Sequence, residues 1–180
     1  MNATAEKPRL QNAGDDEATP RRVLFVCTGN TCRSPMAAAL LNDMARPREV
    51  CSLSPERGTA PRLIASSAGL WAMEGDPITP AAAAALREAG VPPLPHNDYT
   101  AHRARTVTEQ MLETADLVVA ISGNHAMELM MRFPAHASKI GTLGVDIPDP
   151  FGGSAEVYRT CLMQLRHGIR ACFFGGEDEP

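Results

Sequence analysis

The run CTGNTCRSP at 27–35 places a thiol, Cys27, and a guanidinium, Arg33, six residues apart in one short segment. The apolar run 23–26 precedes this segment, and the helix-forming run 36–41 follows it. The thiol therefore falls on a turn that leads from a strand into a helix. A nucleophilic sulfur with a permanently charged guanidinium close by is suited to gripping a dianionic phosphate and attacking its phosphorus.

The loop between this thiol and the helix has the features of an anion-binding site. The sulfur must react as a thiolate, and consecutive backbone N–H groups can hold the anion beside the positive end of the helix. Gly29 and Asn30 suit the left-handed backbone conformations that curl such a loop. We expect the phosphate to be bound by the loop residues Thr28, Gly29, Asn30, Thr31, Cys32 and Ser34.

The residues at the end of the loop have predicted roles of their own. Ser34 is a candidate helix N-cap and a hydrogen-bond donor to the sulfur of Cys27, and Pro35 suits the first helical position. Arg33 presents a planar fork that can take two phosphate oxygens and stabilise the charge that spreads over them in the transition state. This chemistry requires no metal and no other cofactor.

Cleavage also needs an acid to protonate the leaving group and a base to activate water. One carboxyl group can serve as both, and the Asp-Pro pairs at Asp76 and Asp149 compete for this role. Asp149 follows the last predicted strand, on the side where open α/β sheets bind ligands, so we choose Asp149. We expect structural roles for the other candidate side chains, Asp116 at a strand start, Asp146, His102 and His125.

Strand and helix patterns alternate along the chain and predict the scaffold that holds these residues. Strands are expected at 22–27, 63–67, 117–121 and 139–143, and helices at 35–45, 80–89, 108–114, 125–133 and 155–173. Apolar strands without alternation, separated by helices, are typical of a parallel sheet that is covered on both faces. The predicted fold is α/β, a doubly wound, flavodoxin-like sandwich with a central four-stranded parallel sheet.

Composition narrows the class of protein further. The 180 residues carry a formal charge of -4, which gives no sign of binding to nucleic acid or to an anionic membrane. Five cysteines match no zinc pattern, and neither a signal peptide nor a transmembrane stretch is apparent, which predicts a reduced, cytoplasmic setting. We expect a disordered leader at 1–20, a catalytic domain at 21–174 with a surface excursion at 46–62, and a frayed tail at 175–180, with a monomer as the default.

Five motifs resemble those of the low-molecular-weight protein tyrosine phosphatase family. They are VCTGNTCRSPMA at 26–37, SSAG at 66–69, HRAR at 102–105, ADLV at 115–118 and DPFGG at 149–153. The resemblance covers about 21–174 and implies a protein phosphatase that works through a cysteinyl-phosphate intermediate on a phosphorylated protein. It also supports Asp149 as the acid, since the family's acid lies in an Asp-Pro-aromatic run near the C-terminal helix.

One loop position distinguishes branches of that family. Tyrosine-directed relatives usually carry Ile or Leu where this chain has Thr31, and Thr together with the run 149–154, DPFGGS, resembles the protein-arginine phosphatase branch. A hydroxyl can hydrogen-bond a guanidinium, whereas a branched alkyl group would leave its N–H groups unpaired, at about 1–3 kcal/mol. Phe151 and Trp71 are candidate walls for the substrate side chain. Phosphoarginine is the favoured substrate, with phosphotyrosine as the alternative.

Other interpretations of the cysteines stay open at this point. Cys32 either packs beneath the loop or, as the resemblance implies, traps oxidised Cys27 as a disulfide. An arsenate reductase of the same fold would need relay cysteines, and none occurs between Cys51 and Cys161. A non-hydrolytic cysteine phosphocarrier is a further alternative, against which Arg33 and Asp149 together argue.

Overall fold

The computed structural model describes residues 20–46 and 63–175. The predicted disordered leader, the surface excursion and the frayed tail lie outside these residues, apart from their boundary positions. The elements that hold the loop at 27–35 all lie within them.

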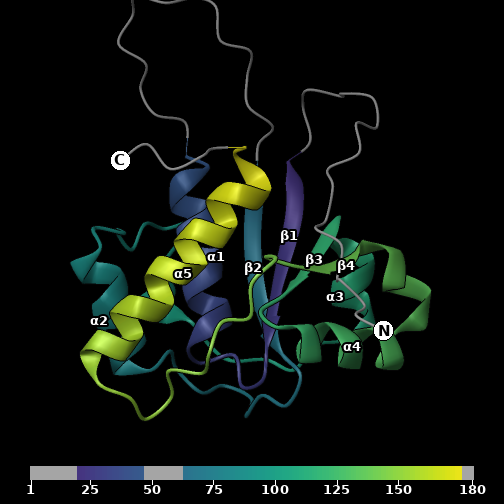
Figure 1. The fold of residues 1–180 in the computed structure, drawn as a ribbon, viewed down its shortest axis with the longest axis horizontal. Coiled ribbons are helices and arrows are strands. Elements are labelled where there is room, and N and C mark those ends of the chain that lie inside the picture. The colour runs from purple at the N-terminus through teal and green to yellow at the C-terminus, as the bar shows by residue number, and fades with distance from the viewer. Residues whose placement is uncertain (1–19, 47–62, 176–180) are drawn as a thin grey trace, which may run out of the picture.

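Four parallel strands form the central layer, in the order β2-β1-β3-β4 (Figure 1). Their bounds are Arg21–Cys27 for β1, Leu63–Gly69 for β2, Leu117–Ala120 for β3 and Ile140–Thr142 for β4. The register pairs Cys27 with Gly69, so the reactive thiol lies where two neighbouring strands end together. The predicted four-stranded parallel sheet is confirmed, except that Lys139, expected in the fourth strand, belongs to the preceding 3-10 turn.

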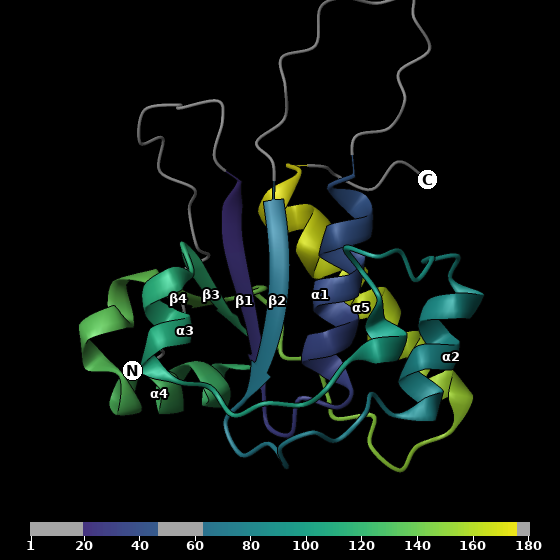
Figure 2. The same ribbon diagram turned by 180° about the vertical axis from the view of Figure 1, so that it is seen from behind.

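Helices cover both faces of the sheet (Figures 1 and 2). One face carries α1 (Arg33–Met44), α2 (Pro80–Glu88) and α5 (Ala155–Phe173), and the other carries α3 (Glu109–Thr114) and α4 (Gly123–Arg132). Short 3-10 turns occupy Tyr99–Ala101 and Pro134–Lys139. No helix in the described ranges is both long and apolar enough to cross a membrane.

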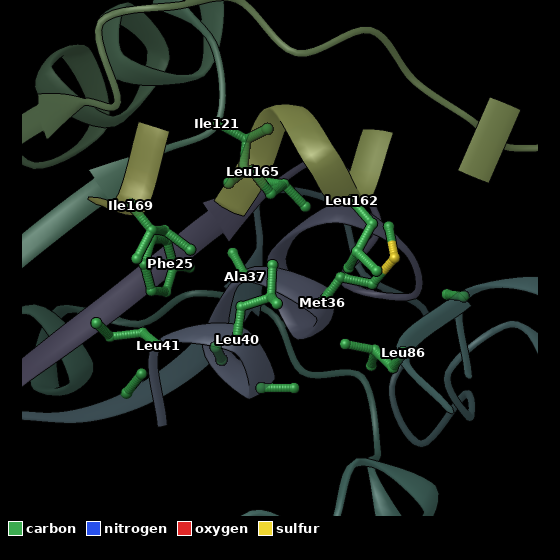
Figure 3. Close-up of a cluster of buried hydrophobic side chains, with 14 of the residues drawn as sticks. Phe25, Met36, Ala37, Leu40, Leu41, Leu86, Ile121, Leu162, Leu165 and Ile169 are labelled. Carbon is green, nitrogen blue, oxygen red and sulfur yellow. The ribbon is translucent and has the colours of Figure 1, made fainter. Parts of the chain in front are cut away.

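Both faces of β1 are buried, which explains its unbroken apolar sequence. Phe25 and Cys27 belong to the core beneath α1 and α5, whereas Leu24 and Val26 belong to the core beneath α3 and α4. Figure 3 shows Phe25 on the first of these faces, among leucine side chains from α1 and α5. A strand covered on both sides cannot shift toward solvent, so the thiol at its end is held firmly.

The N-terminus of α1 differs from the sequence prediction. The helix begins at Arg33, and its N-cap residue is Cys32, which makes no side-chain cap hydrogen bond. Ser34, predicted as the N-cap, is instead the second helical residue, and Pro35 is the third rather than the first. Pro35 still costs no helical bond, because the first backbone bond runs from Met36 N to Cys32 O at 3.2 Å.

Asp116 ties the starts of two adjacent strands together. Its Oδ2 accepts a hydrogen bond from the backbone N–H of Arg22 at 2.7 Å. The predicted structural role at a strand start is therefore confirmed for this aspartate.

The close packing of α5 on the sheet gives a test of the core. A Cβ added at Gly168 would lie 2.9 Å from the Cβ of Leu143, whereas one at Gly123, the first residue of α4, would meet only Asp146 Oδ1 at 3.8 Å. We expect Gly168→Ala to lower the free energy of unfolding by about 1–2 kcal/mol, since overpacking outweighs the better helix propensity of Ala. Gly123→Ala should stay within about 0.5 kcal/mol of wild type or exceed it. Urea denaturation of both variants checks this, and equal stabilities would contradict it.

Candidate active site

The thiol of Cys27 lies buried at the carboxyl end of the inner strand β1. Its Sγ is 3.0 Å from the Oγ of Ser34, on the first turn of α1, which confirms the predicted contact between these side chains. The same hydroxyl lies 3.2 Å from the carbonyl oxygen of Ala68, to which it can donate when the sulfur is protonated. When the sulfur is a thiolate, the Ser34 proton can turn to the sulfur instead. Ser34 can therefore follow the charge on the nucleophile.

Asn30 fixes the curl of the loop. It is the one non-glycine residue of the described chain with a positive φ, 57°, and it is fully buried. Its Nδ2 donates to the hydroxyls of Ser34 and Ser67, each at 2.9 Å, and its Oδ1 accepts from the backbone N–H of Arg105 at 3.0 Å. The side-chain amide thus joins the loop to α1, to β2 and to the segment after the 3-10 turn at 99–101.

His102 holds the backbone of the same residue. Its Nε2 lies 2.7 Å from the carbonyl oxygen of Asn30, and because a carbonyl only accepts, this nitrogen must carry a proton. Burial lowers the pKa of His102, and the nearby Arg105 and Arg103 act in the same direction, while the bond to Asn30 opposes them. The predicted structural role of His102 is confirmed, with the phosphate-loop backbone as its partner.

The end of β2 packs directly against the loop, and a glycine makes this contact possible. A Cβ at Gly69 would lie 2.6 Å from the carbonyl oxygen of Thr28 and 3.1 Å from the Cβ of Asn30. The next two backbone N–H groups, of Leu70 and Trp71, donate to the carbonyls of Cys27 and Thr28, each at 2.9 Å. These carbonyls are therefore bonded outward, which leaves the N–H groups of the loop for an anion.

Arg33 brings the second half of the predicted chemistry to the loop. Its Nη2 donates to Asp149 Oδ2 at 2.8 Å, and its Nη1 donates to the carbonyl of Ile147 at 3.2 Å. Its Nε is buried and is the one buried side-chain nitrogen or oxygen in the described residues without a hydrogen-bond partner. A buried guanidinium N–H left unpaired in a site rich in donors indicates a place for an oxyanion.

Asp149, chosen as the acid, lies at the solvent-facing edge of this arrangement. Its side chain is 52% exposed, against 8% for Arg33, and its Oδ1 accepts from the backbone N–H of Phe151 at 3.2 Å. The competing Asp76 is exposed and joins its loop through backbone bonds to 73 and 104, while Asp146 accepts from Gly123 N at 2.7 Å. The structure therefore brings Asp149, and neither alternative, into contact with Arg33.

A second histidine reaches the loop from the opposite layer. His125, on the first turn of α4, is buried, and its Nε2 lies 2.9 Å from Thr28 Oγ1. Its Nδ1 lies 2.9 Å from the Oγ of Ser122, the N-cap of the same helix. Burial lowers the pKa of His125, and the positive charge of Arg33 acts in the same direction. The prediction of a structurally satisfied histidine is confirmed, although its partner was not foreseen.

The second loop cysteine, Cys32, contacts the hydroxyl groups of two residues outside the loop. Cys32 Sγ lies 3.4 Å from both the hydroxyl of Tyr158 and that of Thr79. Burial raises the pKa of Tyr158 to about 12, and it raises the pKa of the neighbouring Cys161 thiol to about 12 as well. Both groups therefore stay protonated and uncharged at neutral pH.

The three predicted specificity residues are less buried than Cys27 and Arg33. Thr31 is half-buried, and its Oγ1 lies 3.8 Å from Cys32 Sγ, too far for a strong hydrogen bond. Phe151 is 71% exposed and Trp71 is 66% exposed. The ring of Trp71 stacks against the guanidinium of Arg132 at 4.9 Å, so part of its surface is already used for packing.

Sequence reasoning missed several supports of the loop. They are Ser67, His102, Arg105, His125 and Tyr158, each of which contacts a loop residue. The motifs SSAG and HRAR contain three of them, but nothing in their spacing says that they meet at Asn30. That meeting depends on the parallel pairing of β2 with β1 and on the return of the chain at 102–107.

Comparison with known proteins agrees with this geometry. A family model described as "Low molecular weight phosphotyrosine protein phosphatase" matches residues 22–175. A protein-arginine-phosphatase of Geobacillus stearothermophilus is 37% identical over 153 residues, which cover 81% of this chain and 89% of that protein. The solved structure of the YwlE arginine phosphatase from the same organism has a TM-score of 0.68 at 36% identity and covers 83% of this chain and 88% of its own.

A tyrosine-directed relative is equally similar. The solved structure of a low molecular weight protein tyrosine phosphatase from T. tengcongensis has a TM-score of 0.69 at 36% identity and covers 83% of this chain and 95% of its own. Overall identity therefore does not separate the two specificities. The match over nearly all of the described residues does establish the family, and the chain belongs to the low-molecular-weight phosphotyrosine protein phosphatases.

Proposed function

We propose that this protein hydrolyses phosphorylated proteins, phosphoarginine in preference to phosphotyrosine, through a phosphocysteine formed on Cys27. One observation carries the phosphatase chemistry: the buried Arg33 guanidinium beside the thiol loop, with its Nε unpaired. The preference for phosphoarginine rests on Thr31 and on similarity to relatives named arginine phosphatases.

The first step uses the loop as a cradle. The Cys27 thiolate attacks phosphorus, and a phosphorus–sulfur bond forms while the bond to the substrate side chain breaks. The loop N–H groups and Arg33 stabilise the charge on the phosphoryl oxygens. Asp149, protonated, gives its proton to the departing nitrogen or oxygen. Thr28, Gly29, Asn30, Thr31, Cys32 and Ser34 are the proposed phosphate-binding residues.

The contact between Asp149 and Arg33 suggests how these roles follow one another. In the free protein the carboxylate accepts from Nη2 of Arg33. A bound phosphate offers that nitrogen a more highly charged acceptor, which releases the exposed carboxyl group toward the leaving group. After the first step Asp149, now ionised, takes a proton from water as the water attacks phosphorus and expels the Cys27 thiolate.

The two Asp-Pro pairs give a matched test of the acid. Asp149→Asn should lower kcat for phosphoarginine and phosphotyrosine peptides by about a hundredfold or more, because no proton reaches the leaving group. Asp76→Asn should leave kcat unchanged, and Cys27→Ser should abolish turnover. Steady-state phosphate release without added metal measures all three. A loss with Asp76→Asn instead would move the acid to the other loop.

Thr31 is the proposed determinant of substrate choice. Among the described residues its hydroxyl has no strong hydrogen-bond partner, and Thr31 is only half-buried, so the hydroxyl can accept from a guanidinium N–H. Phe151 offers an exposed aromatic face nearby in the acid loop, and Trp71 offers another at the end of β2. An isoleucine at 31 would leave the guanidinium N–H groups without that acceptor, yet would pack well against an aryl ring.

Exchange of this residue gives the specificity test. We expect Thr31→Ile to lower the ratio of kcat/KM for phosphoarginine to kcat/KM for phosphotyrosine about tenfold or more, through the lost hydrogen bond. Thr31→Ser, which keeps the hydroxyl, is the matched control and should preserve the ratio. A wild-type preference for phosphotyrosine would favour the alternative substrate and leave the mechanism intact.

Cys32 is proposed as the redox partner of Cys27. Both belong to one loop, and both are free thiols in the structure. After oxidation of Cys27 to a sulfenic acid, the Cys32 thiol would displace water and form a disulfide, which external thiols can reduce. Such chemistry, like the thiolate nucleophile itself, suits a reducing, cytoplasmic compartment.

Peroxide treatment tests this protection. Cys32→Ser should recover less activity than wild type when dithiothreitol follows hydrogen peroxide, because oxidation of Cys27 then proceeds to irreversible acids. Cys172→Ser is the control variant, because Cys172 lies on α5, outside the loop. Equal recovery in wild type and Cys32→Ser would show that Cys32 has only a packing role.

A further inference from the structure

We propose that His125 is a positioning residue for phosphate binding: it donates a hydrogen bond to Thr28 and so turns the Thr28 hydroxyl proton toward a bound phosphoryl oxygen. The inference deepens the proposed function and rests on the phosphate site described above. It adds a side-chain donor, held from α4, to the backbone donors of the loop.

The imidazole of His125 bridges two hydroxyls, with Nε2 at 2.9 Å from Thr28 Oγ1 and Nδ1 at 2.9 Å from Ser122 Oγ. The Ser122 oxygen also accepts from the backbone N–H of His125 at 3.4 Å, as the N-cap of α4. Thr28 Oγ1 lies 3.5 Å from Nη2 of Arg33, which can only donate.

The protons that these three side chains carry limit which of them donates and which accepts in each hydrogen bond. A neutral imidazole has one N–H, and each hydroxyl has one proton. If the proton of His125 is on Nε2, Ser122 donates to Nδ1 and Thr28 accepts from His125. The Thr28 proton is then left for the mouth of the loop, where Thr28 is exposed and an anion can accept it.

The opposite direction is less favourable. With the imidazole proton on Nδ1, Ser122 would accept from the ring and from the backbone, and its own proton would have no acceptor among the contacts of the described residues. Thr28 would donate to Nε2 and lose its donor for phosphate. The first direction gives the Ser122 proton an acceptor within the protein, Nδ1 of His125, and it is the direction that we propose. The lowered pKa of His125 agrees with a neutral ring.

The Thr28 hydroxyl differs from the other phosphate donors because its proton can rotate. Arg33 and the loop N–H groups are fixed by the backbone and by buried contacts, whereas a threonine hydroxyl rotates freely unless a partner holds it. His125 is the closer of two such partners, at 2.9 Å against 3.5 Å for Nη2 of Arg33, and it belongs to α4, on the opposite face of the sheet from α1. Orientation before binding removes the entropy cost of finding the right rotamer.

A double-mutant cycle tests the proposal. Thr28→Val and His125→Leu should each weaken the binding of inorganic phosphate, measured by calorimetry on the unreacted enzyme, by about tenfold, the value of a hydrogen bond to a charged acceptor. The double variant should bind no more weakly than either single variant, because both remove one interaction. His125→Gln, whose amide can still donate, should restore most of the affinity.

A control variant distinguishes a loss of phosphate affinity from a loss of folding stability. Thr108→Ala removes the N-cap of α3, away from the loop, and should lower stability without changing the phosphate affinity. If His125→Leu loses stability but binds phosphate like wild type, or if its loss adds in full to that of Thr28→Val, the proposal is wrong. A wild type that binds phosphate with this coupling yet releases none from peptides would refute the proposed function alone.

Discussion

The loop depends above all on one buried asparagine. Asn30 has a left-handed backbone conformation. Its side-chain amide donates to the hydroxyls of Ser34 and Ser67, and its oxygen accepts from the backbone N–H of Arg105. A buried amide with all of these partners is costly to disturb, because each broken bond leaves an unpaired group in the core. This arrangement sets the curl of the loop, and the curl decides where the N–H groups, the thiol and Arg33 point.

The catalytic charges are balanced around that fixed loop. Arg33 is buried yet bonded to an exposed carboxylate and a carbonyl, so its charge is compensated in the free protein. A phosphate that enters meets a guanidinium held in place with one N–H still unpaired. Arg33 is buried and Asp149 is exposed, which agrees with the proposed roles of a fixed anion site and a proton donor at its edge.

Much of this could be predicted from the sequence, for identifiable reasons. Apolar runs buried on both faces predict parallel strands, and the spacing of Cys27 and Arg33 predicts the phosphate loop. The prediction of Ser34 as the N-cap was wrong. Ser34 has the residue type of an N-cap, but its hydroxyl contacts Cys27 and Asn30, and the helix begins one residue before it. The partner of His125 could not be predicted because it lies 97 residues away in the sequence.

Burial differs between the residues proposed to transfer phosphate and those proposed to select the substrate. Cys27, Arg33 and Ser34, which hold and attack phosphate in the proposed mechanism, are buried on β1 and α1. Thr31, Phe151 and Trp71, which would meet the rest of the substrate, are partly or largely exposed and have few internal partners. Under the proposed function, changes at these three positions alter the choice between a guanidinium and an aryl ring and leave the buried contacts of Cys27 and Arg33 in place. Such a division fits the finding that two relatives of equal identity, one named an arginine phosphatase and the other a tyrosine phosphatase, share this fold.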